Sequence, residues 1–208
     1  MEIAHSPVTL LILLITVVTS IRAWNDLSLF NRFILYPYQM AKDKSWYRMI
    51  TSGLIHGDTW HLAFNMIALY SFSSGSYGLE SVLGSIQFLL FYVVSLVLSD
   101  LSTVVRHKDN PAYRALGASG AVSAVVMAMI LNNPSGEIIM LFLPIPIPGW
   151  LFGILFVAYS HYASRNSKDN IGHEAHLWGA IVGLVLAWIM SPVIREHFLH
   201  FLQAKGIL

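Results

Sequence analysis

The chain contains no cysteine among its 208 residues. Disulfide bonds, thiol catalysis and thiolate metal sites are therefore excluded. Charged residues are also scarce, since they make up 11% of the chain against about 25% of a typical soluble domain. Hydrophobic residues make up 56%, and the formal net charge of +1 gives no indication of nucleic-acid binding. This composition indicates an integral membrane protein.

Long apolar stretches fill most of the chain and leave no room for a separate soluble domain. They cover residues 7–24, 58–77, 85–105, 115–131, 149–163 and 173–190. A spanning helix needs about 20 residues, within a range of roughly 17–25, so the fourth and fifth stretches are short. No Lys or Arg precedes the first stretch, which favours a retained helix over a signal peptide. The sequence predicts an all-α membrane protein, one domain over 1–208 with six transmembrane helices.

The connections between these stretches differ in character. The first, 25–56, is long and rich in aromatic and basic residues, which favours the membrane interface; the alternative is a platform that meets the substrate. The fourth, Ile138 to Pro148, has proline at alternate positions, which predicts an extended or turned segment at the interface. Ten of the twelve Lys and Arg lie in or beside the first, third and fifth connections. Read alone, this bias places those connections in the cytoplasm.

Three short polar motifs stand near the starts of the second, fourth and sixth stretches. They are His61-Leu62-Ala63-Phe64-Asn65, Gly117-Ala118-Ser119-Gly120, and Ala175-His176 followed by Gly179 and Gly183. Burying an unpaired polar side chain costs roughly 2–7 kcal/mol, so polar groups within a membrane span are candidates for function. Serine, histidine and asparagine supply a nucleophile, a base and oxyanion donors, which together suit acyl transfer.

In a chain with six spans, alternate helices start on the same side of the membrane, and this places the three motifs together. The second, fourth and sixth helices begin on the same side of the membrane, so Asn65, Ser119 and His176 are expected at similar depth. Ser119 is expected a few residues into its helix. Small residues in the fourth and sixth stretches allow their backbones to approach closely, which would bring Ser119 beside His176. The alternative is a packing seam in which the serine and histidine are incidental.

In this order and spacing the motifs resemble those of the rhomboid family of intramembrane serine proteases. The resemblance extends over roughly 46–190 and implies a six-helix rhomboid-like bundle. It implies that Ser119 is the nucleophile and His176 the general base, with no third acid. It also implies that Asn65 donates a hydrogen bond to the oxyanion. His56, in Gly53-Leu54-Ile55-His56, matches a family histidine and is a further candidate donor.

Other positions match motifs that support the site in the family. These are His61, Gly117, Gly120, Gly179, Gly183 and, in the pair Tyr47-Arg48, Arg48. Many relatives carry an aromatic residue four positions after the nucleophile, against which the ring of the base stacks. This chain has Ser123 there, so the packing beneath His176 requires an aromatic from another position. The family usually keeps both termini in the cytoplasm and the site on the opposite side, and we follow that orientation against the charge bias.

The predicted function is hydrolysis of peptide bonds in or next to transmembrane helices of membrane-protein substrates by a Ser–His dyad. No cofactor, metal or nucleic acid is expected, and the partners are transmembrane substrates and the lipid bilayer. The protein is expected in the bacterial inner membrane as a multi-pass protein.

Three alternatives compete with this function. The first is a zinc site made by His173-Glu174-Ala175-His176 with His61 and His56, but the histidines of that tetrapeptide are three apart, whereas the His-Glu-x-x-His motif needs them four apart. The second is a catalytically inactive rhomboid-like binder of transmembrane clients, and the third is a small transporter.

Overall fold

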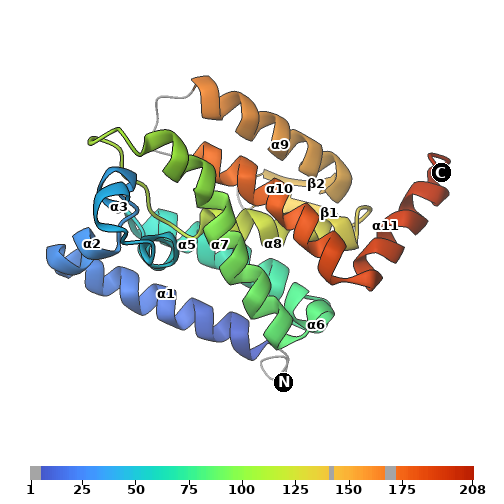
Figure 1. Cartoon of the computed structure of the whole chain (residues 1–208). Helices are drawn as coiled ribbons and strands as arrows, with labels where there is room; N and C mark the ends of the chain where they lie inside the picture. The colour runs from blue at the N-terminus through green and yellow to red at the C-terminus, as the bar shows by residue number, and fades with distance from the viewer. Residues whose placement is uncertain (1–5, 141–142, 167–171) are drawn as a thin grey trace.

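A computed structural model describes residues 6–140, 143–166 and 172–208 (Figure 1). The long helices are α1 (Pro7–Asn25), α5 (Thr59–Ser73), α7 (Ser85–His107), α8 (Ser119–Asn132), α9 (Gly149–Asn166), α10 (His173–Met190) and α11 (Pro192–Ala204). The short elements are α2 (Leu27–Phe33), α3 (Pro37–Asp43), α4 (Arg48–Thr51), a 3₁₀-helix (Ser52–Leu54), α6 (Leu79–Leu83) and the strands β1 (Glu137–Met140) and β2 (Leu143–Pro148). A helix occupies each of the six apolar stretches.

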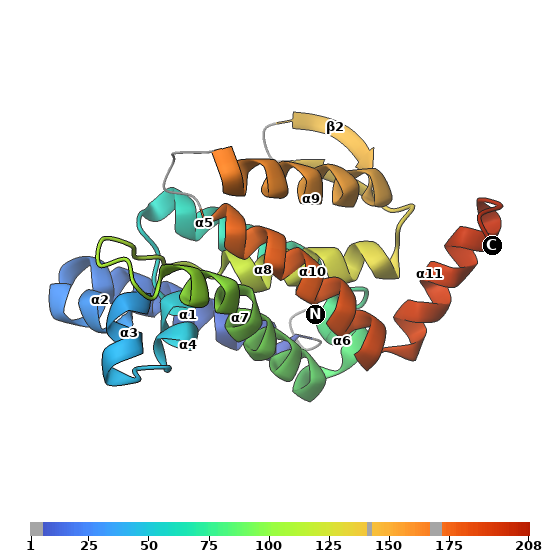
Figure 2. The same ribbon diagram turned by 45° about the horizontal axis from the view of Figure 1, so that its top comes forward.

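The centre of the bundle is α8, which is apolar and built largely from small residues. Ten of its fourteen residues are buried, and they pack against α7, α10 and α5. Figures 1 and 2 show α7 and α10 crossing over α8, with α9 at the outer edge beside α10. Small side chains at Ala121, Ala124 and Ala128, all fully buried, let the neighbouring helices approach α8 closely.

Among the described residues, three helices are long and apolar enough to cross a membrane: α1, α7 and α10. The α8 helix is apolar but has 14 residues, below the roughly 17–25 that a spanning helix needs. The expected membrane-type helical fold is therefore confirmed. The count of six spans remains a prediction, because α5 and α8 are short and α9, with 18 residues, is less apolar than the three candidate spans.

The first connection folds into α2, α3, α4 and the 3₁₀-helix, and Arg48 holds it together. The Arg48 side chain is buried. Its Nη1 donates to the carbonyl oxygens of Asn31 and Ile34, each at 2.8 Å, and its Nε donates to the Ser45 hydroxyl at 3.0 Å. Because buried backbone carbonyls require a donor, one guanidinium satisfies groups that this loop would otherwise leave unpaired.

The fourth connection contains the hairpin β1–β2, as the alternating prolines predict. Ile138 pairs with Ile147, and the N–H of Gly149 donates to Gly136 at 2.7 Å. In this register Pro148 is the partner of Glu137. Proline has no backbone N–H, so it is tolerated at strand ends and on edge strands. Proline on the outer edge also prevents another strand from pairing there. Of the fifth connection, expected over Arg165 to Gly172, residues 167–171 lie outside the described chain.

The amino end of α1 is anchored by a buried carboxylate. Glu80 of α6 is 1% exposed and accepts from the N–H groups of Val8 at 2.9 Å and Thr9 at 2.7 Å. The Ser85 hydroxyl donates to the same carboxylate at 2.7 Å. The first N–H groups of a helix have no partner within the helix and favour negative charge, so Glu80 fixes where α1 begins.

Candidate active site

The turn before Ser119 depends on glycine. Gly117 has a φ of 110°, a conformation that side chains with a Cβ disfavour. A Cβ on Gly117 would also lie 2.7–2.8 Å from two atoms of the His61 ring. The α8 helix begins directly after this turn, with Ala118 as its N-cap and Ser119 as its first residue. The expectation that Ser119 lies a few residues inside its helix was therefore wrong, because Gly117 delays the start of the helix.

His56 holds this turn through both nitrogens of its ring. Its Nδ1 lies 3.1 Å from the hydroxyl oxygen of Ser20 on α1, and that hydroxyl donates to the carbonyl of Leu54 at 3.1 Å. The Ser20 oxygen therefore accepts from Nδ1–H. In that tautomer Nε2 carries a lone pair, and the Ala118 N–H donates to it at 3.4 Å. Ala118 immediately precedes Ser119, so His56 connects α1 to the start of α8.

The surroundings of His56 keep its ring neutral. The side chain is fully buried, and burial, with a smaller contribution from His61, lowers the pKa of His56 from 6.5 to about 3. The indole N–H of Trp24 donates to the His56 carbonyl at 2.8 Å, which fixes the backbone as well. A neutral imidazole is required if one nitrogen is to donate and the other to accept.

His61 and Asn65 occupy the first turns of α5 on one face, as their spacing predicts. The rings of His61 and His56 meet edge to face, with centroids 4.9 Å apart. The Nδ2 of Asn65 donates to the carbonyl of His61 at 2.9 Å, and its side chain is buried. One of the two N–H bonds of the Asn65 amide is thereby used, and the second remains for another acceptor.

Backbone contact between α8 and α10 brings the other two motifs together. A Cβ on Gly179 would collide with the backbone of Gly120, and a Cβ on Gly183 would collide with the backbone of Ala124. A Cβ on Gly120 would lie 3.5 Å from the carbonyl oxygen of Ala175 and would collide with the hydroxyl of Ser99 on α7. The predicted close seam is thus confirmed.

The seam places the first turns of α8 and α10 against each other. Ser119 precedes Gly120, and His176 follows Ala175, so both residues lie where the two helices meet. The hydrogen bond between the Ser119 hydroxyl and the His176 ring stays a prediction.

Two aromatic rings contact the ring of His176, one from α9 and one from α10 itself. The ring of Phe156 stacks on that of His176 with centroids 6.3 Å apart and an interplanar angle of 29°. The ring of His173 meets His176 edge to face at 6.0 Å and Tyr159 at 5.6 Å. Phe156 therefore supplies the aromatic contact that Ser123 does not.

Two supporting contacts tie the site to the rest of the bundle. Glu174 accepts from the Ser102 hydroxyl at 3.1 Å and forms an ion pair with Arg106 at 3.4 Å, which fastens the start of α10 to α7. Leu35 and Ala115 exchange backbone hydrogen bonds of 3.0 and 3.1 Å. The loop that Arg48 organises is thereby joined to the segment that leads into Gly117.

Comparison with known proteins agrees with this arrangement. The family model described as the rhomboid domain matches residues 43–193. The chain belongs to the rhomboid family. The matched region of this rhomboid contains all the motifs described above, from Arg48 to Gly183. Within the described part of the chain, no group of three or more His, Asp or Glu is arranged to hold a metal ion.

Several curated relatives of this rhomboid are mitochondrial. Rhomboid protein 1, mitochondrial, of Saccharomyces cerevisiae is 28% identical over 76% of this chain and 46% of its own length. Presenilin-associated rhomboid-like protein, mitochondrial, of Mus musculus is 31% identical over 65% and 36%. The chain thus spans between a third and a half of these relatives' length. Rhomboid protease GlpG of Haemophilus influenzae is 26% identical over 76% of this chain and 77% of its own length.

The apolar helices support a membrane location for this rhomboid. The expectation of a bacterial inner membrane is not supported by its mitochondrial relatives. Composition and hydropathy, from which the membrane prediction came, do not distinguish one membrane compartment from another.

Sequence reasoning missed Ser20, Trp24 and Phe156. Ser20 could have been identified from the sequence, because it is a polar residue within an apolar span and such residues are candidates for function. In the structure it is fully buried. Trp24 ends the first apolar stretch, where an aromatic residue is typical of the membrane interface and indicates no specific contact. Nothing in the sequence around Phe156 distinguishes it from the other apolar residues of α9, because its role depends on the packing of α9 beside α10.

Proposed function

We propose that this rhomboid is an intramembrane serine endopeptidase. It hydrolyses peptide bonds in or next to the transmembrane helices of membrane-protein substrates. The observation that carries the proposal is the backbone contact at Gly120 and Gly179, which holds the helix that starts with Ser119 against the helix that carries His176. A nucleophile and a base on touching first turns are the minimum for covalent acyl transfer.

In this mechanism Ser119 Oγ attacks the carbonyl carbon of the scissile bond while a ring nitrogen of His176 takes the hydroxyl proton. His176 then protonates the leaving amine, and water hydrolyses the acyl-enzyme with His176 again acting as base. The oxyanion accepts from the backbone N–H of Ser119 and from the Asn65 amide. One such donor contributes roughly 10²–10³ in rate.

His56 takes a positioning role in this proposal. The resemblance suggests it as an oxyanion donor, but its Nε2 accepts from the Ala118 N–H, and a nitrogen that accepts one hydrogen bond has no proton to donate to an oxyanion. The network therefore supports a role in holding the turn before Ser119. His61 packs against Gly117 and limits how that turn can move.

The substrate follows from the position of the site in a membrane protein. A transmembrane helix hides its carbonyl groups in hydrogen bonds, so the scissile bond becomes accessible only where the helix unwinds. Small or flexible residues such as Gly, Ala and Ser near the cleavage site assist that unwinding. Water must also reach Ser119, since it is the second substrate.

The decisive experiment is cleavage of a generic transmembrane substrate by purified protein in detergent and in proteoliposomes. Wild type is compared with Ser119→Ala, His176→Ala and the double variant. Each single variant is expected to abolish cleavage, and the double variant should be no worse because the two residues act as one unit. Unchanged circular dichroism and thermal midpoint serve as the folding control.

Near-normal turnover by Ser119→Ala would overturn the serine-protease mechanism. Binding of the transmembrane substrate by the wild type without any cleavage would favour the alternative of an inactive rhomboid-like binder. Loss of activity in a metal chelator would favour the zinc alternative.

A further inference from the structure

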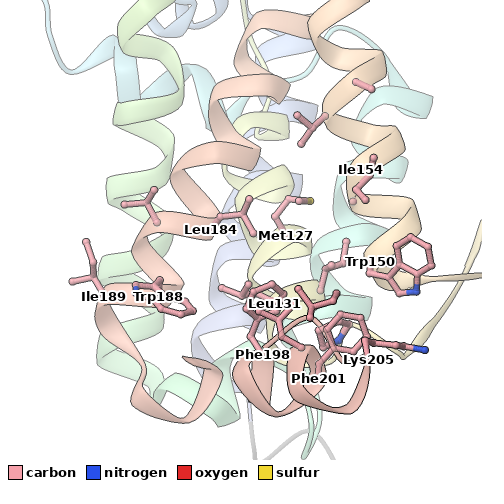
Figure 3. A pocket seen from close by; sticks show the side chains of 18 of the residues that line it. Met127, Leu131, Trp150, Ile154, Leu184, Trp188, Ile189, Phe198, Phe201 and Lys205 are labelled. Atoms are coloured by element: carbon pink, nitrogen blue, oxygen red, sulfur yellow. The ribbon is translucent and has the colours of Figure 1, made fainter. Parts of the chain in front are cut away.

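A large groove lies between α8, α9, α10 and α11 and extends along α9 from Trp150 to His161. Its volume is about 1310 Å³. Figure 3 shows Met127, Leu184 and Ile154 turned toward a common space between α9 and α10. His176 stands at the start of α10, whereas the groove reaches Ile189 near the end of the same helix. Ile189 lies 13 positions further along the helix, roughly 20 Å from His176 along its axis, so the end of the groove at α11 is distant from the candidate active site. The other end, at Val157 and His161 of α9, approaches Phe156, which stacks on His176.

The groove is almost entirely apolar. Among the described residues that line it, the only ones with a titratable side chain are His161 and Lys205. Its walls include Val185 and Ile189 of α10, which are 51% and 65% exposed. Because α10 is apolar enough to cross a membrane, these exposed side chains face hydrocarbon. Water in such a space would contact apolar surface, which is unfavourable. In the membrane the space is therefore filled by acyl chains of the bilayer.

The helix α11 closes one end of the groove, and this end is amphipathic rather than apolar. This helix is capped by the Ser191 hydroxyl and leads away from the bundle in both Figure 1 and Figure 2. Its apolar side packs inward, with Phe198 meeting Trp188 edge to face at 6.4 Å. Its other side carries exposed charged and polar residues. An amphipathic helix of this kind lies in the membrane interface, and tryptophans such as Trp188 are enriched at the same level.

The position of Lys205 is set by the end of α11. Gly206 has a φ of 67°, and the N–H of Ile207 donates back to Leu202 at 3.0 Å. This turn folds Ile207 onto the groove, which it lines together with Lys205. The Lys205 ammonium lies 6.0 Å from the centre of the Phe201 ring. A positive charge therefore stands at the interfacial end of a hydrocarbon-filled groove.

We propose that this groove is a binding site for one anionic phospholipid, with its acyl chains between α9 and α10 and its phosphate at Lys205. The groove matches an amphiphile, because a long apolar surface ends in a single cation at headgroup level. A transmembrane helix of another protein could also contact the apolar walls. Such an occupant would not explain why a positive charge, that of Lys205, stands at the end of the groove. A lysine near the surface of an anionic membrane contributes about 1 kcal/mol, which is enough to prefer anionic over zwitterionic headgroups.

The test is native mass spectrometry of the full chain in detergent, titrated with phosphatidylglycerol and, separately, with phosphatidylcholine of the same acyl chains. Wild type is expected to retain one phosphatidylglycerol more tightly than phosphatidylcholine. Lys205→Ala should weaken retention of phosphatidylglycerol about fivefold and that of phosphatidylcholine by less, because the choline ammonium offsets the charge of its phosphate. Lys108→Ala is the matched control, since Lys108 is an exposed lysine that follows α7 and does not line the groove.

A second variant tests the apolar part of the site. Val157→Trp places a large ring inside the groove and should reduce retention of both lipids, with the thermal midpoint confirming that the variant folds. Equal phosphatidylglycerol retention by Lys205→Ala and Lys108→Ala would overturn the headgroup assignment. Full lipid retention by folded Val157→Trp, or displacement of the lipid by a second copy of the chain, would overturn the site itself. None of these readouts depends on protease activity.

Discussion

The Nδ1 atom of His56 lies 3.1 Å from the hydroxyl oxygen of Ser20, which links the first helix of the chain to the turn that carries the proposed nucleophile. The link selects the tautomer in which Nε2 of His56 accepts from the Ala118 N–H. A residue of α1 thus controls the geometry of a turn that stands almost a hundred residues later in the sequence.

Ser20→Ala should lower kcat of the proposed protease about tenfold with little change in KM. Without the Ser20 hydroxyl the other tautomer of His56 becomes accessible, and the Ala118 N–H loses its acceptor. A net hydrogen bond contributes about 0.5–1.5 kcal/mol, of which the upper end corresponds to that factor. Ser20→Thr, which keeps the hydroxyl, should retain activity. The measurement is steady-state cleavage of a transmembrane substrate.

Thr16→Ala is the matched control for Ser20→Ala. Thr16 is buried four residues earlier on α1, and its hydroxyl has no hydrogen-bond partner within the described part of the chain. Activity should therefore be unchanged. Equal losses in Thr16→Ala and Ser20→Ala would mean that α1 acts through packing alone.

Phe156→Ala should lower kcat, whereas Phe156→Tyr should preserve it. The Phe156 ring stacks on His176 and restricts its orientation, which a Tyr ring can do equally and an Ala side chain cannot. Ser123→Ala is the control and should have little effect, because the base ring packs on α9 rather than on Ser123. The reverse pattern, with a loss in Ser123→Ala and none in Phe156→Ala, would show that the ring of His176 is held from α8.

Much of the fold was predictable because membrane-length apolar stretches determine helices directly. The observed α1, Pro7–Asn25, and α10, His173–Met190, agree closely with the expected 7–24 and 173–190. The start of α8 was placed four residues too early, because 115–118 are as apolar as a helix but Gly117 takes a positive φ. The amphipathic α11 was missed because it carries no long apolar stretch.

The polar motifs of the candidate site could be found in the sequence, whereas most of the contacts around them, apart from the α8–α10 seam, could not. Ser119, Asn65 and His176 stand out as polar residues at the starts of apolar stretches. The bonds of His56 to Ser20 and Ala118 span 36 and 62 positions in the sequence, and no local pattern contains such long-range information. The same limit applies to Phe156, whose contact with His176 is set by how α9 packs.

Gly183→Ala should destabilise the bundle and reduce activity, in contrast to Gly153→Ala. A Cβ on Gly183 would collide with the backbone of Ala124, which cannot move aside without separating α8 from α10. A Cβ on Gly153 would lie 3.2 Å from the terminal methyl of Met127, a flexible chain that can adjust, and in ordinary contact with the Ile130 side chain at 3.5 Å. Overpacking of this kind costs about 1–3 kcal/mol.

Gly183→Ala and Gly153→Ala are compared by measuring the thermal midpoint and substrate cleavage on the same preparation of each variant. The intrinsic helix preference for Ala over Gly, roughly 0.5–1 kcal/mol, acts in both variants and so cancels in the comparison. Equal midpoints for Gly183→Ala and Gly153→Ala would contradict the close α8–α10 seam.

Asn65→Ala should lower kcat by roughly 10–10³ with little change in KM, because the Asn65 amide is proposed to act on the oxyanion of the transition state. Its Nδ2 also donates to the His61 carbonyl, so the fold must be checked by thermal midpoint. Asn65→Asp keeps the size but removes the N–H donors and should be equally impaired. A rise in KM with unchanged kcat would instead make Asn65 a residue that binds substrate.

The stability of the protein should fall with acid in a way that depends on His56. Burial lowers the pKa of His56 from 6.5 in the unfolded chain to about 3 in the folded protein. Between these values the unfolded chain binds a proton that the folded protein does not, so stability is lost as the pH falls below 6.5. Above pH 6.5 this contribution is complete and constant. The limiting slope for one proton is about 1.4 kcal/mol per pH unit.

His56→Gln removes the titrating group and should flatten the dependence of the thermal midpoint on pH between 6.5 and 4.5. The variant should be less stable than wild type at pH 7.5, because Gln cannot keep both hydrogen bonds of the ring, and the difference should shrink in acid. His200→Gln is the matched control, since His200 is exposed on α11 and should leave the slope as in wild type. Parallel curves for wild type and His56→Gln would mean that His56 is already accessible to protons in the folded protein, and the tautomer that orients the turn before Ser119 would then not be fixed.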